Sequence, residues 1–166
     1  MITITLNKIR EHHPCASGWL MILAARGGAE ADFDEPFPLS FALESNGLDD
    51  TLWALRCLPE HGSLWRKYAV WCARQVQHLM TDQRSVDALD VAWRYSDGLA
   101  TDEEMWAARA SAGAAAWASA DTADATRAAA YAAARASADA AHAADATRAA
   151  QKAKLCAILD AGEWVD

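Results

Sequence analysis

The chain has 166 residues, and 53% of them are hydrophobic, so it can build one domain with a real core; collagen-like, disulfide-knot and disordered classes are excluded. Alanine accounts for 41 of these residues, which leaves far fewer bulky side chains than the percentage suggests. The formal net charge is −8, and no basic stripe is visible, so we expect no direct contact with nucleic acid.

Cap and turn residues in the first part of the chain predict a series of short helices. Thr5 can cap a helix that Pro14 ends, and Ser17 can cap a second one that Gly27 stops. Apolar side chains recur at helical spacing in the segments that follow, between turn residues such as Pro59 and Gly98. The expected helices after the second one are 39–45, 48–58, 63–80 and 85–95.

A different kind of helix is expected after residue 100. Thr101 and Glu104 have the spacing of a capping box, and no proline follows them. The alanine-rich segment therefore predicts helix from 102 to about 160, and it repeats the motif of 124–129 at 145–150. Small side chains let two backbones approach closely, so we expect this helix to pair, within the chain or across a homodimer. The alternative is a lone exposed helix.

These patterns predict an all-α protein with two parts. Residues 1–100 form a compact multi-helix core domain, and 101–166 form a long alanine-rich helix or helical hairpin. Tryptophan falls mostly on the apolar stripes of the expected helices, so core packing is the expected role of most of these side chains. They are Trp19, Trp53, Trp65, Trp71, Trp93 and Trp106.

Recognised catalytic and metal-binding motifs are absent from the sequence. Cys15, Cys57, Cys72 and Cys156 form no CxxC pair, which favours a reducing compartment, and no zinc-like spacing of His and Cys occurs. The sequence has no signal-peptide pattern and no apolar run of membrane-spanning length. We therefore expect a cytoplasmic protein without catalytic residues, metal, cofactor or membrane contact.

Small acidic groups are the main candidates for a functional surface, since such groups suit a basic partner. Trp65 joins them because tryptophan is frequent at the centre of protein interfaces and Trp65 precedes two basic residues. The alternative is that the acids only solvate the surface. The candidate partner-binding residues are Asp32, Asp34, Glu35, Asp49, Asp50, Trp65, Asp102, Glu103 and Glu104.

Two motifs, Pro14–Trp19 and Leu43–Arg56, resemble those of a family of small helical, alanine-tailed immunity proteins found in bacterial and phage genomes. The resemblance covers roughly residues 5–104. It implies a protein that binds and neutralises an effector, and it brings no catalytic residue with it. The same motifs also have a purely structural interpretation, as a helix stop and the start of the next helix.

The leading hypothesis is a non-enzymatic inhibitor that occludes the basic surface of a bacterial effector. The effector would be a nuclease toxin, which makes the chain an immunity protein, or a CRISPR-type defence complex, which makes it a phage anti-CRISPR or other counter-defence protein. Both require the same surface physics, so the sequence does not separate them. The alternative hypothesis is a structural or oligomerisation module built on the alanine-rich helix.

Overall fold

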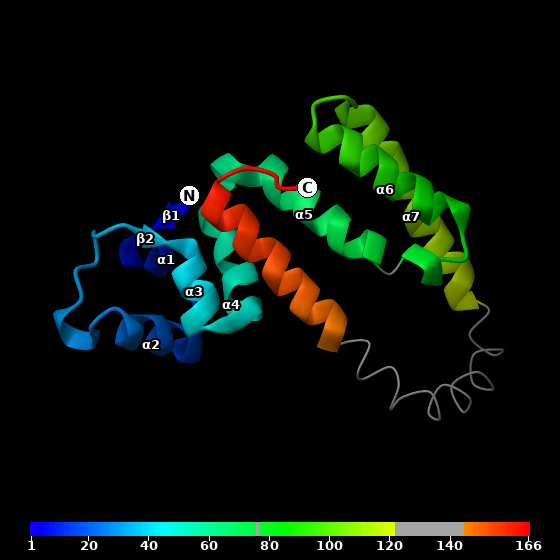
Figure 1. Cartoon of the computed structure of the whole chain (residues 1–166). Coiled ribbons are helices and arrows are strands. Elements are labelled where there is room, and N and C mark those ends of the chain that lie inside the picture. The colour runs from blue at the N-terminus through cyan, green and yellow to red at the C-terminus, as the bar shows by residue number, and fades with distance from the viewer. Residues whose placement is uncertain (76, 122–144) are drawn as a thin grey trace, which may run out of the picture. The chain divides into compact units, whose positions relative to one another are not determined.

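The computed structural model describes residues 1–75, 77–121 and 145–166 and is mostly helical, which confirms the prediction of an all-α fold (Figure 1). Its only sheet among these residues has two strands. The chain divides into two compact units: the first comprises 1–62 and 150–166, and the second comprises 63–149. The predicted boundary at residue 100 lies inside the second unit, and 150–166 belong with the first.

The first unit is a cluster of short helices around one antiparallel strand pair, in which Thr3 faces Pro38 and Ile4 faces Phe37. Residues 150–161 add a further helix to this unit (Figure 1). Its other elements, in chain order, are β1 (Thr3–Ile4), α1 (Leu6–Glu11), α2 (Ala16–Ala25), η1 (Gly28–Glu30), β2 (Phe37–Pro38), α3 (Leu39–Ser45), α4 (Gly47–Ala54), η2 (Leu55–Cys57) and η3 (Pro59–His61).

Helix caps follow the sequence at one place and differ from it at another. The Thr5 hydroxyl accepts the Lys8 amide at the start of α1, which confirms the predicted cap. For α2 the prediction of Ser17 was wrong: Cys15 is the cap, and its sulfur accepts the Gly18 amide. The helix begins two residues earlier than expected because Cys15, immediately after Pro14, has the extended backbone of a cap.

The segment after α3 is less regular than the predicted helix over 48–58. The α-helix α4 ends at Ala54, and two short 3-10 turns, η2 and η3, carry the chain to His61. Leu55, Cys57 and Leu58 are buried in these turns. In the tighter 3-10 turns these three neighbouring apolar side chains all point inward. A continuous α-helix would place them on different faces.

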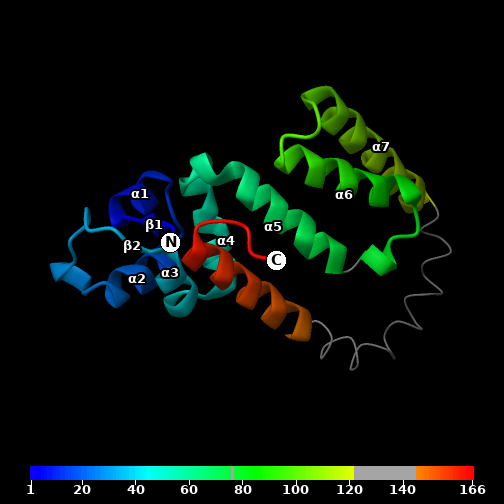
Figure 2. The same ribbon diagram turned by 45° about the horizontal axis from the view of Figure 1, so that its top comes forward.

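Both ends of the chain meet in the first unit. The Ile2 amide donates to the Leu159 carbonyl at 2.8 Å, and the Ile2 carbonyl accepts the Leu39 amide at 2.9 Å. Ile2 thus links the helix of 150–161 to the start of α3. Figures 1 and 2 show the red end of this last helix beside β1 in both views.

The core of the first unit is aliphatic, with a single phenylalanine. Its fully buried side chains include Leu6, Phe37, Leu39, Leu43, Leu155, Ile158 and Leu159. The expectation that most of the six named tryptophans pack in the core is wrong, because Trp106 is 74% exposed and the other five are only partly buried. Basic side chains cover several of these rings: Lys67 and Arg74 lie over Trp93, and Arg56 lies over Trp53.

The second unit contains α5 (Gly62–Gln75), η4 (Gln77–Leu79), α6 (Gln83–Ser96) and α7 (Asp102–Asp121). Helices α6 and α7 lie side by side (Figure 1). The predicted capping box is confirmed: the Glu104 amide donates to the Thr101 hydroxyl at 3.2 Å, and the Thr101 amide donates to the Glu104 carboxylate at 2.7 Å.

The middle of the alanine-rich segment, 122–144, lies outside the described residues, and so do the predictions that the segment is continuous helix and that it pairs. The repeat at 145–150 is helical. No helix in the described ranges has both the length and the apolar character needed to cross a membrane.

Replacing Leu155 with alanine tests whether the returning helix holds the first unit together. Leu155 is fully buried, so Leu155→Ala should lower the free energy of unfolding by about 2–5 kcal/mol. Leu99→Ala is the matched control, because Leu99 is 69% exposed and its loss should cost less than about 0.5 kcal/mol. Urea unfolding followed by circular dichroism measures both, and equal losses would show that this helix does not anchor the core.

Candidate functional site

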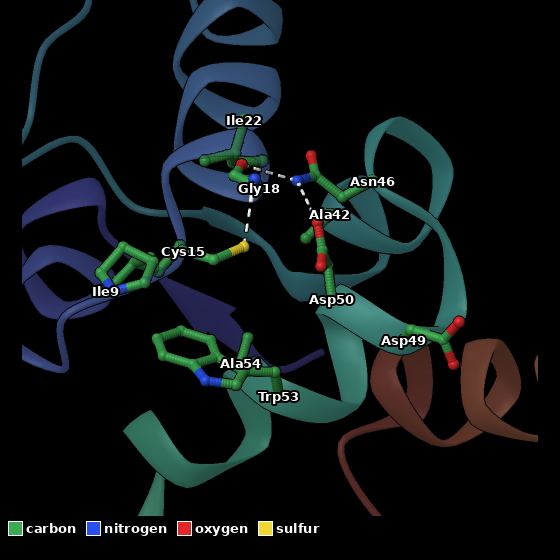
Figure 3. A pocket seen from close by; sticks show the side chains of 11 residues that line it. Ile9, Cys15, Gly18, Ile22, Ala42, Asn46, Asp49, Asp50, Trp53 and Ala54 are labelled. Atoms are coloured by element: carbon green, nitrogen blue, oxygen red, sulfur yellow. Dashed lines mark hydrogen bonds between the residues drawn. The ribbon is translucent and has the colours of Figure 1, made fainter.

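The first unit contains a pocket of about 230 Å³ between α2, α3 and α4 (Figure 3). Its walls are mainly apolar, and a few polar groups converge on one side. Such a combination is typical of binding sites. The lining residues are Ile9, Pro14, Cys15, Gly18, Ile22, Ala42, Asn46, Asp49, Asp50, Trp53 and Ala54.

Asn46 holds the polar side of the pocket in place. Its amide nitrogen donates to the Gly18 carbonyl at 2.8 Å and to the Asp50 carboxylate at 3.0 Å, so one side chain ties α2 to α4. Gly47 has a φ of +83°, a left-handed conformation that few residues other than glycine adopt. This turn separates α3 from α4 directly after Asn46.

Gly18 allows α2 and α4 to approach closely at the pocket. A Cβ atom at this position would lie 2.7 Å from the Asp50 carboxylate and 3.2 Å from the Cys15 sulfur. Gly18 is buried, and a larger residue would push the carboxylate out of its place. The pocket therefore depends on the absence of a side chain at residue 18.

The Asp50 carboxylate is half-buried beside this apolar space. Within the part of the chain that the structure describes, it accepts one hydrogen bond, from Asn46, and no basic side chain forms a salt bridge with it. Figure 3 shows the carboxylate near Gly18 and Cys15, above the Trp53 indole. A cation that enters the pocket would stabilise a carboxylate in such surroundings.

Cys15 lines the pocket and is exposed. A hydrogen bond with the Ser17 hydroxyl and a second from the Gly18 amide lower the pKa of Cys15, although the nearby charge of Asp50 opposes this shift. The other three thiols behave differently, because burial raises the pKa of Cys57, Cys72 and Cys156. Cys15 is thus the thiol most ready to ionise.

Trp53 forms the apolar wall opposite Cys15 (Figure 3). The Arg56 guanidinium lies over its ring, 5.0 Å from the centroid, and also donates to the Trp53 carbonyl at 3.0 Å. These contacts restrain the indole, so the wall is held in place before anything binds.

Of the nine predicted partner-binding residues, the structure brings only Asp49 and Asp50 to this pocket. They differ in direction, because the Asp49 carboxylate points away from the cluster of Asn46, Asp50 and Cys15 (Figure 3). Trp65 lies on α5, in the second unit, and is partly buried.

The acids of the loop between η1 and β2 are exposed but take part in local structure. Asp32 accepts the Asp34 amide at 2.9 Å, and Asp34 accepts the Asn7 side-chain amide at 2.6 Å. Glu35 forms a salt bridge with Arg26, whose guanidinium lies over the Phe37 ring. These carboxylates thus fix the loop as well as charging the surface.

The acids at the start of α7 are likewise exposed and belong to the second unit. Asp102 accepts the Tyr95 hydroxyl at 2.5 Å, and Glu104 completes the capping box. Glu103 is the third exposed acid of this first turn. Two of the three therefore contribute to helix initiation and packing, in addition to charge.

Cys15, Asn46 and Trp53 were not among the candidate residues predicted from the sequence, although the two motifs singled out there contain all three. Pro14–Trp19 supplies three lining residues, and Leu43–Arg56 supplies five. These are the two motifs that carry the family resemblance. Two segments that lie about 30 residues apart in the chain thus line one pocket, which the chain order did not reveal.

Comparisons with known proteins return no match: neither the models of protein families, nor the curated proteins, nor the solved structures include one that is similar to this chain. The resemblance to immunity proteins therefore stays a prediction. In the described residues, no three His, Cys, Asp or Glu side chains are grouped as metal ligands.

Thiol labelling tests the described state of Cys15. Iodoacetamide should modify Cys15 first, with a pH midpoint below that of the unfolded chain, because the hydrogen bonds from Ser17 and Gly18 favour the thiolate. Peptide mass mapping over a pH series measures the rates. The result is contradicted if Cys72 or Cys156 reacts as fast at neutral pH, or if Ser17→Ala leaves the midpoint of Cys15 unchanged.

Proposed function

We propose that this chain is a non-enzymatic binding protein that inhibits a bacterial effector by covering a basic surface with its first unit. The observation that carries the proposal is the joint placement of an apolar pocket and of most of the negative charge in this unit. The pocket offers area to bury, and the charge selects a basic partner.

The charge is unevenly divided between the two units. The first unit has twelve acidic and six basic residues, a net charge of −6 out of −8 for the whole chain. The second unit, with eleven acidic and nine basic residues, is close to neutral. Several acids of the second unit pair with its own basic side chains, as in Lys67–Asp97 and Arg74–Asp90. A basic surface is therefore attracted mainly to the first unit.

An effector that acts on nucleic acid fits this surface best. Nuclease toxins and CRISPR complexes bind phosphate backbones through clustered lysine and arginine. An acidic protein on that surface excludes the substrate without any reaction of its own. The proposed function includes toxin immunity and phage counter-defence, and its expected location is the cytoplasm, where both effectors meet their substrates.

A binding and inhibition assay tests the proposal. The purified chain is immobilised and exposed to a panel of nuclease toxins and CRISPR complexes at low and high salt. One effector should bind at low salt, lose affinity at high salt, and stop cleaving DNA when an equimolar amount of the chain is added. Inhibition by occlusion would be contradicted if every effector that binds the chain continues to cleave DNA at a saturating concentration of the chain.

Charge reversal locates the surface. Asp32→Lys with Glu44→Lys changes two exposed acids of the first unit and should weaken binding by about tenfold or more at low salt. Asp87→Lys with Glu103→Lys makes the same charge change in the second unit and should have much less effect. Equal losses in the two variants would mean that only net charge matters. Thermal unfolding confirms that each variant is folded.

A further inference from the structure

We propose that the pocket between α2 and α4 receives one basic side chain, lysine or arginine, from the partner protein, with Asp50 as the acceptor of its charge. This inference rests on the proposed function, because it supplies the central anchor of that interface. A buried anchor in a preformed pocket is the usual origin of strong interface contacts.

The size of the pocket favours one side chain over a whole small molecule. Its volume is about 230 Å³. Sites for drug-sized ligands have about 300–1,000 Å³. Two of its lining residues, Cys15 and Asp49, are exposed, so the space lies at the surface of the unit, where a side chain that projects from another protein can reach it.

The electrostatics favour a cation. Asp50 is half-buried, accepts one hydrogen bond, and has no salt bridge among the described residues. An incoming ammonium or guanidinium group would supply the missing countercharge and a charge-assisted hydrogen bond. An acidic or purely apolar occupant would leave the carboxylate uncompensated as water is displaced.

The walls fit the stem of such a side chain. Ile9, Ile22 and Trp53 surround the space with aliphatic and aromatic surface. Lysine and arginine both carry a run of methylene groups that packs on apolar walls while the charged end reaches a polar partner. The pocket has this polarity, with apolar walls and Asp50 on one side (Figure 3).

Short capped peptides test the pocket without knowledge of the effector. The probes are acetyl-Gly-Lys-Gly-amide, its arginine analogue, and the norleucine analogue, which keeps the stem but lacks the charge. Titration is followed by NMR at the Trp53 indole N–H and the Gly18 amide. At least one basic peptide should bind in the millimolar range, and the norleucine peptide should bind at least about tenfold more weakly.

Two variants change the pocket in different ways. Asp50→Asn keeps the shape of the side chain and removes its charge. It should therefore weaken the binding of the basic peptide by about tenfold or more and reduce the preference of the pocket for that peptide over the norleucine peptide. Gly18→Ala should displace the Asp50 carboxylate and weaken the binding of every peptide. Alanine favours the helix at this position, so this variant should stay folded. Glu30→Gln removes one exposed charge away from the pocket and should bind like the wild type.

Three outcomes would overturn the inference. Equal binding of norleucine and lysine peptides would mean that the pocket selects apolar side chains. Full retention of binding in Asp50→Asn would remove Asp50 as the acceptor. Spermidine that binds about tenfold more tightly than either basic peptide would assign the pocket to a free polyamine.

The peptide titration and the inhibition assay test different claims, so a negative result in one can be told from a negative result in the other. Loss of peptide binding while the effector is still inhibited would reject only the anchor. Inhibition that survives Asp50→Asn and Gly18→Ala but is lost on charge reversal would likewise reject the anchor and leave the proposed function standing. Peptide binding by a chain that inhibits none of the effectors would reject the proposed function.

Discussion

The pairing of Ile2 with both Leu159 and Leu39 is the constraint on which the first unit depends. The backbone of one residue joins the start of the chain, the helix of 150–161 and the first residue of α3. The same helix contributes three of the fully buried side chains of the core, Leu155, Ile158 and Leu159. A small domain of short helices gains little from any one of them, so it needs this closure by distant segments to bury enough apolar surface.

The pocket is a consequence of how α2 meets α4. Two hydrogen bonds from Asn46 fix the distance between the helices, and the missing side chain at Gly18 leaves room for the Asp50 carboxylate. The carboxylate is thus held by structure that is present before any partner arrives. Preorganisation of this kind reduces the entropy lost on binding, so it would favour the side-chain anchor that we propose for this pocket.

Local features could be predicted from the sequence, and features that depend on distant residues could not. The Thr5 cap, the limits of α3 and the Thr101–Glu104 capping box depend on residues a few positions apart, and all three were predicted. The strand pair, the burial of Leu155 and the meeting of the two motifs depend on tertiary contacts. The prediction that tryptophans pack in the core failed because helical spacing shows which residues share a face of a helix. It does not show whether the apolar core or a surface basic side chain, such as Lys67 over Trp93, covers that face.

The division of the chain has a consequence for its synthesis. The second unit is inserted between the two parts of the first, so its 87 residues leave the ribosome before Leu155 and Leu159 do. The first 62 residues lack these core side chains until residues 150–166 have been synthesised. Closing so long a loop also slows folding, because distant contacts form late. The nascent first unit therefore exposes an unfinished apolar face until residues 150–166 have emerged and can pack against it.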